Sequence, residues 1–187
     1  MVKSRASLQE GGIVRRIVLA VALVVSVTLL TAGSAQSATS KSAFQVFVEP
    51  TLTSAAKGLV IETDLQGSFD VAAKTASGGG SFAIMSGDTV LESGTFTLTR
   101  LVAFQFYGCG EIDGITLPPD FCGGRALFAI HATAASGEQG DGLLEVNCQI
   151  HDPGGQAPPG TSEGVKVNTR GINFNKHITG DNLFVRQ

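Results

Sequence analysis

The sequence predicts an all-β fold: a single antiparallel domain closed or partly closed into a β-barrel, with a two-sheet sandwich as the alternative. Three observations support this prediction. Apolar and polar residues alternate with a period of two, turns rich in the chain's 24 glycines separate the alternating runs, and no stretch after residue 35 has a helical period. Many short strands between glycine turns are typical of antiparallel sandwiches and barrels.

The N-terminal residues have the composition of a secretory signal peptide. Arg15 and Arg16 precede an uncharged, mostly apolar run over residues 17–30, and small residues follow at 31–35. This order of charged, apolar and small residues is the signal-peptide pattern, and the run is shorter than the roughly 20 residues of a membrane-spanning helix. We therefore expect a signal peptide over residues 1–35 and one domain over residues 36–187. The domain would be secreted, to the periplasm or the medium, with no stable membrane insertion after cleavage.

The mature chain is acidic and long enough for one domain. Its 152 residues contain nine Lys and Arg against fifteen Asp and Glu, a formal charge of −6. A chain of this length buries about 70% of its unfolded surface. The negative charge argues against a nucleic-acid partner, whose phosphates require a basic face, and against docking on anionic lipid.

The alternation predicts the strands one by one. It is clearest over residues 94–99, where Phe96 and Leu98 share one face and three threonines share the other. The same pattern predicts strands at 44–48, 59–63, 68–72, 81–85, 125–133, 143–151, 165–168, 172–175 and 183–186. Glycine turns are expected at 77–80, 86–88 and 137–142.

A short motif of Gly, then Ser or Thr, then Phe recurs at residues 67–69, 80–82 and 94–96. One interpretation is a repeat architecture. The other is a series of hairpin strands, each leaving a glycine turn and placing a phenylalanine inward. Consecutive hairpins form a meander, and closing a meander into a barrel removes its exposed edges.

Three cysteines remain after the signal peptide. Cys109 and Cys122 flank a turn-rich segment, and a disulfide between them would contribute about 3 kcal/mol in the chain-entropy model. Cys148 shares one strand face with Leu144 and Val146, and this apolar face predicts a buried thiol. Whether Cys148 is free or paired stays open at the level of the sequence.

One segment, residues 101–107, is apolar on both faces and breaks the alternation. It is interpreted either as a central strand or bulge, or as an apolar patch or pocket wall. On the second interpretation, Phe104, Phe106 and Tyr107 are candidate ligand-binding residues. Phe121, across the cysteine loop, would join them.

No motif predicts a catalytic residue, a metal site or a cofactor. Residues 160–164 match the pattern G-x-S-x-G, but the serine follows a proline-rich loop and precedes a strand instead of a helix. The histidines, His131, His151 and His177, do not share a strand at i, i+2 spacing, the simplest way to aim two imidazoles at one ion from a sheet.

These observations predict an exported, non-catalytic β-domain that binds a small apolar ligand or a protein partner. The alternative is a hydrolase or isomerase that acts in a barrel lumen and uses His131 or His151 with nearby acids. A third possibility is a structural protein of the cell surface or extracellular matrix.

Overall fold

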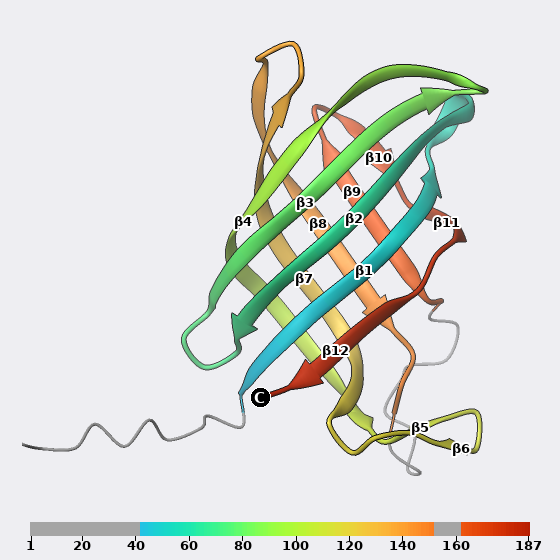
Figure 1. Ribbon diagram of the computed structural model, residues 1–187. Coiled ribbons are helices and arrows are strands. Elements are labelled where there is room, and N and C mark those ends of the chain that lie inside the picture. The colour runs from blue at the N-terminus through green and yellow to red at the C-terminus, as the bar shows by residue number, and fades with distance from the viewer. Residues whose placement is uncertain (1–41, 152–161) are drawn as a thin grey trace, which may run out of the picture. The chain divides into compact units, whose positions relative to one another are not determined.

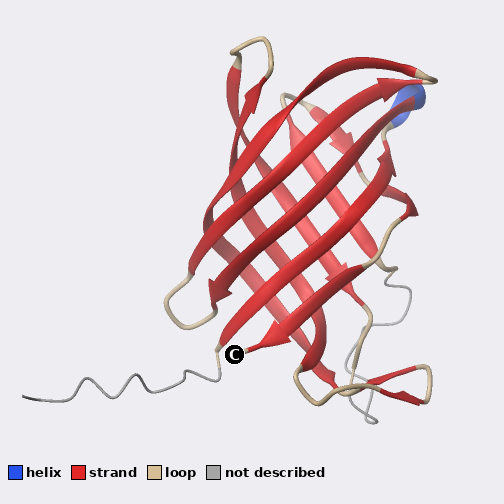
Figure 2. Ribbon diagram, in the orientation of Figure 1, coloured by secondary structure: helices blue, strands red, loops and turns tan. Residues whose placement is uncertain are grey.

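The computed structural model describes residues 42–151 and 162–187, which form an antiparallel β-domain with one 3₁₀ turn and no α-helix among them (Figures 1 and 2). The expected signal peptide lies outside the described residues, as does most of the predicted proline-rich loop with residues 160 and 161 of the G-x-S-x-G match. In the described ranges, no helix has the length and apolar character needed to cross a membrane.

Most of the predicted alternating runs lie within longer strands, but the runs 68–72, 143–151 and 172–175 extend past strand ends at Asp70, Cys148 and Phe174. The strands, in chain order, are β1 (Ala43–Ser54), β2 (Leu59–Asp70), β3 (Thr75–Ser86), β4 (Thr89–Cys109), β5 (Glu111–Ile112), β6 (Ile115–Thr116), β7 (Phe121–Ala134), β8 (Gln139–Cys148), β9 (Gly164–Thr169), β10 (Ile172–Phe174), β11 (Lys176–Thr179) and β12 (Asn182–Arg186). The 3₁₀ turn η1 (Ala56–Gly58) joins β1 to β2.

The sheet curls into a partly closed barrel, which confirms the predicted fold class (Figure 1). Consecutive strands β1 to β4 pair as a meander, β4 pairs β7, and β8, β9 and β10 continue from β7. Both β11 and β12 pair with β1, and β12 also pairs with the start of β7. The two short strands thus lie between the first strand and the later ones, where they help to close the wall.

Inward-facing aromatic rings fill one end of the barrel. Phe69 of β2 is 3% exposed, and its ring centroid lies 5.1 to 5.7 Å from those of Phe44, Phe104, Phe128 and Phe184. These four rings come from β1, β4, β7 and β12. Because separate hairpins contribute to one cluster, burial of these rings holds the closed wall together.

The predicted glycine turn at 77–80 is wrong. These residues lie within β3, and the predicted strands 59–63 and 68–72 belong to β2, with residues 71 and 72 in the turn that follows it. A Cβ on Gly80 would lie 1.9 Å from the carbonyl oxygen of Asp64. Glycine is needed there for close approach of two backbones, a role that the sequence alone does not separate from a turn.

The predicted turns near residues 87 and 137 are confirmed. Gly87 lies between β3 and β4 with φ +57°, and Gly137 lies between β7 and β8 with φ +88°. Residues with positive φ favour glycine because it has no Cβ. The second turn is shorter than predicted, since β8 already begins at Gln139.

Bulges in β4 explain the break in alternation at residues 101–107. Leu98 and Leu101 are both buried although they are three residues apart, and the β4–β7 register shifts between Leu98 and Arg100. Two further shifts follow, between Leu101 and Ala103 and between Phe106 and Gly108. Each bulge changes which face the next residue occupies. The interpretation as a strand with bulges is therefore confirmed, but the segment is not buried on both sides as expected, since Ala103 and Phe106 are exposed.

Candidate ligand-binding site

The structure separates the four ligand-binding residues predicted from the sequence. Phe104 and Phe106 line one surface pocket with Arg186, whose guanidinium carbon lies 4.9 Å from the ring centroid of Phe106. Phe121 lines a different pocket. Tyr107 is fully buried, and its hydroxyl donates a hydrogen bond of 2.8 Å to the Asn147 side-chain oxygen. The predicted set does not form one site.

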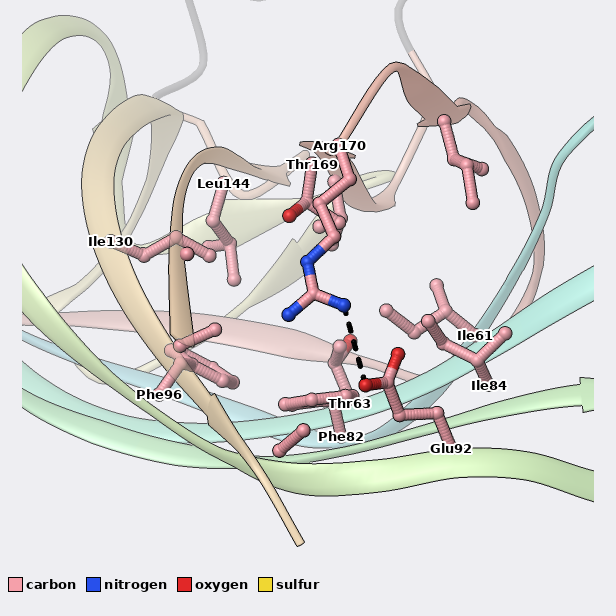
Figure 3. Close-up of a pocket in the computed structure, with 15 residues that line it drawn as sticks. Ile61, Thr63, Phe82, Ile84, Glu92, Phe96, Ile130, Leu144, Thr169 and Arg170 are labelled. Atoms are coloured by element: carbon pink, nitrogen blue, oxygen red, sulfur yellow. Dashed lines mark hydrogen bonds and ion pairs between the residues drawn. The ribbon is translucent and has the colours of Figure 1, made fainter. Parts of the chain in front are cut away.

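A more enclosed cavity lies inside the barrel, away from these residues (Figure 3). Its volume is about 120 Å³. Apolar side chains from seven strands make up most of its wall: Ile61, Phe82, Ile84, Phe96, Ile130, Ala132, Ala134, Leu144, Val167 and Ile172. An apolar cavity with a few polar groups is the usual form of a small-molecule site.

The cavity exists because several residues that line it on β7 and β8 are small. Ala132, Ala134 and Gly140 line the cavity where larger side chains would fill it. Ala132 and Ala134 continue the inward-facing series of Phe128 and Ile130 along β7. The sequence signal for the cavity is therefore a change from large to small residues along one strand face, which a period of two does not reveal by itself.

Charged residues form the rim of the cavity. Arg170 donates to Glu92 at 3.4 Å and pairs with Glu138 at 3.2 Å, and the Arg170 and Glu92 side chains point toward one another in Figure 3. Arg170 and Gly171 have φ +48° and +76° and form the two-residue turn between β9 and β10. Positive φ at both central residues is the geometry of a type I′ hairpin. The side chains of Arg170 and Glu92 are 35% and 28% exposed, so this rim faces solvent.

One polar atom of the cavity wall has no partner. Thr63 of β2 is 2% exposed, and its hydroxyl oxygen makes no hydrogen bond. Thr63 is the last residue of the predicted strand 59–63, so its place on a strand was predictable. That its hydroxyl group lacks a partner was not predictable, because this depends on the cavity beside it.

None of the three histidines lines this cavity. His131 lies on β7 with its side chain 42% exposed and its Nδ1 2.8 Å from Asp141. Within residues 42–151 and 162–187, no three His, Cys, Asp or Glu side chains gather as a metal site would require.

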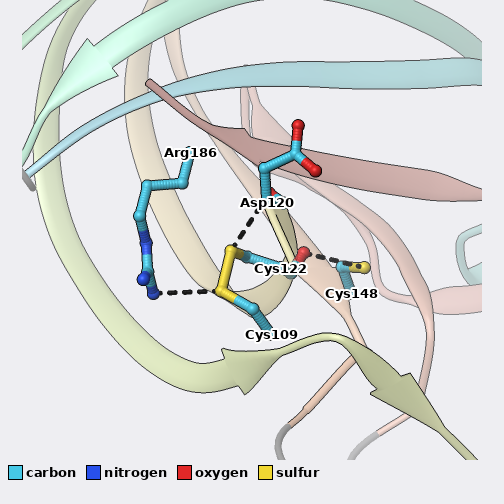
Figure 4. Close-up of a disulfide and its surroundings, with 5 residues drawn as sticks. All are labelled: Cys109, Asp120, Cys122, Cys148 and Arg186. Carbon is cyan, nitrogen blue, oxygen red and sulfur yellow. Dashed lines mark hydrogen bonds between the residues drawn. A yellow bond between two sulfur atoms is a disulfide. The ribbon is translucent and has the colours of Figure 1, made fainter. Parts of the chain in front are cut away.

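The cysteines lie in a different part of the barrel (Figure 4). Cys109 and Cys122 face each other across the β4–β7 ladder and form the predicted disulfide, which encloses the β5–β6 hairpin. Cys148 is buried, as its place in the alternation predicts, and the structure settles the open question of its pairing, because its thiol is free. Burial raises the pKa of Cys148 to about 12, so this thiol stays protonated and is a poor nucleophile at neutral pH.

Beside Cys148 lies a half-buried carboxyl group, that of Glu163. Glu163 accepts hydrogen bonds from the Gln149 backbone N–H at 2.7 Å and from the Asn182 side-chain amide at 3.1 Å. Asn182 also donates to the Asn147 carbonyl oxygen at 3.1 Å. Burial raises the pKa of Glu163, while these hydrogen bonds oppose the shift.

Replacement of Glu163 by glutamine should therefore change how stability depends on pH. The raised pKa means that the folded protein binds this proton more tightly than the unfolded chain. The resulting stabilisation is complete below about pH 4.5, the ordinary value, and is lost as the pH rises through the raised pKa. Relative to Glu163→Gln, the wild-type protein should have a larger free energy of unfolding at pH 4 than at pH 7. Urea denaturation of both proteins at several pH values measures this difference, and a change of opposite sign would contradict the assignment.

Comparison with protein-family models, curated proteins and solved structures found no match to this chain. The candidate site is therefore defined by its geometry: an apolar cavity in the barrel, a charged rim and one unpartnered hydroxyl group.

Proposed function

We propose that this domain binds a small apolar molecule in the barrel cavity lined by Ile61, Phe96 and Leu144. The observation that carries the proposal is the cavity itself, about 120 Å³ of space with a mostly apolar wall. A dry cavity of roughly 150 Å³ lined by aliphatic and aromatic side chains can bind benzene. By the same standard, the slightly smaller cavity here suits a ligand of at most about six non-hydrogen atoms in its enclosed part.

The size of the cavity supports a functional origin. Protein interiors are close-packed and leave few voids larger than a water molecule. By the dependence of stability on cavity volume, a sealed, dry space of this size costs about 3 kcal/mol, and the opening at the rim lowers that cost here. A bound ligand would recover part of that cost by supplying the missing contacts.

The chemistry of the wall favours binding over catalysis. Its polar side chains are Thr63, Thr169 and the paired Glu92 and Arg170. A hydrolase or isomerase needs a positioned base or nucleophile. The Glu92 carboxylate is held by Arg170, and the buried Cys148 does not line the cavity. We therefore place the binding function ahead of the enzymatic alternative.

We also propose that the domain acts after export. The Cys109–Cys122 disulfide is compatible with an oxidising compartment. The sequence supports export independently, because Arg15 and Arg16 followed by the apolar run over residues 17–30 form the pattern of a signal peptide.

A variant that fills the cavity tests the binding proposal. Ala132→Leu adds three carbon atoms to the cavity wall and should abolish binding of benzene as the probe. The wild-type protein should be stabilised by about 1.4 kcal/mol at a benzene concentration ten times the dissociation constant. Calorimetric thermal unfolding with and without benzene measures this shift.

The matched control is Ala103→Leu, because Ala103 is an exposed alanine on β4. It makes the same chemical change outside the cavity and should keep the benzene effect. If benzene stabilised Ala132→Leu as much as the wild-type protein, the ligand would bind elsewhere and the proposal would be rejected.

A further inference from the structure

Building on the proposed binding function, we infer that the ligand is a neutral molecule with one oxygen that hydrogen-bonds the hydroxyl group of Thr63. Alcohols, phenols and small carbonyl compounds belong to this class. Thr63 is then the residue that selects a polar ligand over a hydrocarbon of the same shape.

The Thr63 hydroxyl is buried without a partner. Thr63 is 2% exposed, lines the cavity, and its Oγ1 makes no hydrogen bond. A buried hydroxyl without a partner loses its hydration and gains nothing in return, so native structures seldom leave one. A ligand oxygen in the cavity would supply the missing bond.

Among the described residues, Thr63 differs from the other buried threonines, and of the four buried polar atoms without a partner, the Thr63 hydroxyl oxygen alone belongs to a residue that lines the cavity. Thr51 and Thr53 of β1 are also fully buried, and each hydroxyl donates a hydrogen bond of 2.8 Å to a backbone carbonyl oxygen, of Glu49 and Val165 respectively. The fold thus satisfies these hydroxyl groups internally. At Thr63, where the wall borders open space, it does not.

The charges around the cavity favour a neutral ligand. Arg170 already pairs with the two carboxylates of Glu92 and Glu138. This group carries one excess negative charge when all three residues are ionised, so the rim repels an anion. The rest of the wall is apolar, and burial of an unpaired charge there is unfavourable.

The test compares phenol with toluene, because the two have the same shape and differ by a hydroxyl group in place of a methyl group. Titration calorimetry gives the affinity of each ligand for the wild-type protein, Thr63→Val and Thr63→Ser. Valine keeps the shape of threonine without its hydroxyl group, and serine keeps the hydroxyl group. Each free ligand has the same hydration free energy whichever variant it binds. A change in the phenol-to-toluene affinity ratio between variants therefore reports only on the protein.

We expect the phenol-to-toluene ratio to fall about tenfold in Thr63→Val, from the loss of one buried hydrogen bond. In Thr63→Ser the ratio should stay within about twofold of the wild-type value, because the hydroxyl group remains. Thr63→Val should also be more stable than the wild-type protein without ligand, because the unpartnered hydroxyl group is gone. If Thr63→Val does not fold, Thr63→Ala compared with Thr63→Ser gives the same contrast.

The outcomes separate this inference from the function on which it rests. If both ligands bind and the ratio is equal in the wild-type protein and Thr63→Val, the hydroxyl group does not contact the ligand and the inference is overturned, while the binding function stands. If neither ligand binds the wild-type protein, both are overturned. Tighter binding of benzoate than of phenol would overturn the assignment of a neutral ligand.

Discussion

Replacement of Phe69 by alanine is expected to lower the free energy of unfolding by about 4 kcal/mol. Phe69 is 3% exposed and contacts four other phenylalanine rings. Alanine would leave a cavity among rings from four other strands, and the closed wall gives those rings little freedom to collapse into it. Urea denaturation measures the loss.

The control for this variant is Phe106→Ala, because Phe106 belongs to the same aromatic region but is 40% exposed. In the wild-type protein, the ring centroid of Phe106 lies 6.1 Å from that of Phe44 and 6.3 Å from that of Phe104. Its removal should cost about 1 kcal/mol, since less apolar surface leaves the interior. Equal losses for the two variants would show that Phe69 is not the centre of the aromatic cluster.

The second large effect is expected for Gly80→Ala, at about 3 kcal/mol or more. A Cβ at this position would lie 1.9 Å from the carbonyl oxygen of Asp64 and 2.7 Å from its carbonyl carbon. These atoms are backbone, so the two strands must separate to admit the methyl group. Chemical denaturation again gives the loss of stability.

Gly87→Ala is the matched control for Gly80→Ala. Gly87 lies in the β3–β4 turn with φ +57°, and no atom lies within 4 Å of a Cβ built on it. The expected cost is about 1 kcal/mol, from the left-handed backbone alone. A larger loss for Gly87→Ala than for Gly80→Ala would mean that strand approach at Gly80 is looser than described.

The contrast between these two glycines explains one limit of the sequence analysis. Both stand in glycine-containing runs between alternating segments, and both were interpreted as turns. Gly87 lies in a turn, where its positive φ favours glycine. Gly80 lies in a strand, where the close approach of the neighbouring backbone leaves no room for a Cβ. The second requirement depends on the partner strand, which a local pattern does not reveal.

Most of the barrel wall could be predicted because one face of each strand meets the interior. Phe96 and Leu98 are buried, as their alternation with threonine predicts, and Cys109 pairs with Cys122 across the short loop. The candidate ligand-binding residues were harder to predict. Apolar character alone grouped Phe104 with Tyr107, but bulges in β4 place them in different surroundings.

The cavity itself depends on contacts between strands far apart in the chain. Thr63, Ala132 and Arg170 are ordinary residues of a strand or a turn when considered singly. Only closure of the wall brings them around one space, and only that space leaves the Thr63 hydroxyl without a partner. A search for small inward-facing residues on adjacent predicted strands would have indicated where such a space could form.

The most direct test of the central claim is to locate the bound ligand in solution. Methyl groups of the isotopically labelled protein are observed by NMR during a titration with benzene. The proposed function predicts saturable shifts of Ile61, Ile130 and Leu144, which line the cavity. Shifts confined to Val71, beside Phe104 and Phe106, or the absence of any saturable shift, would contradict it.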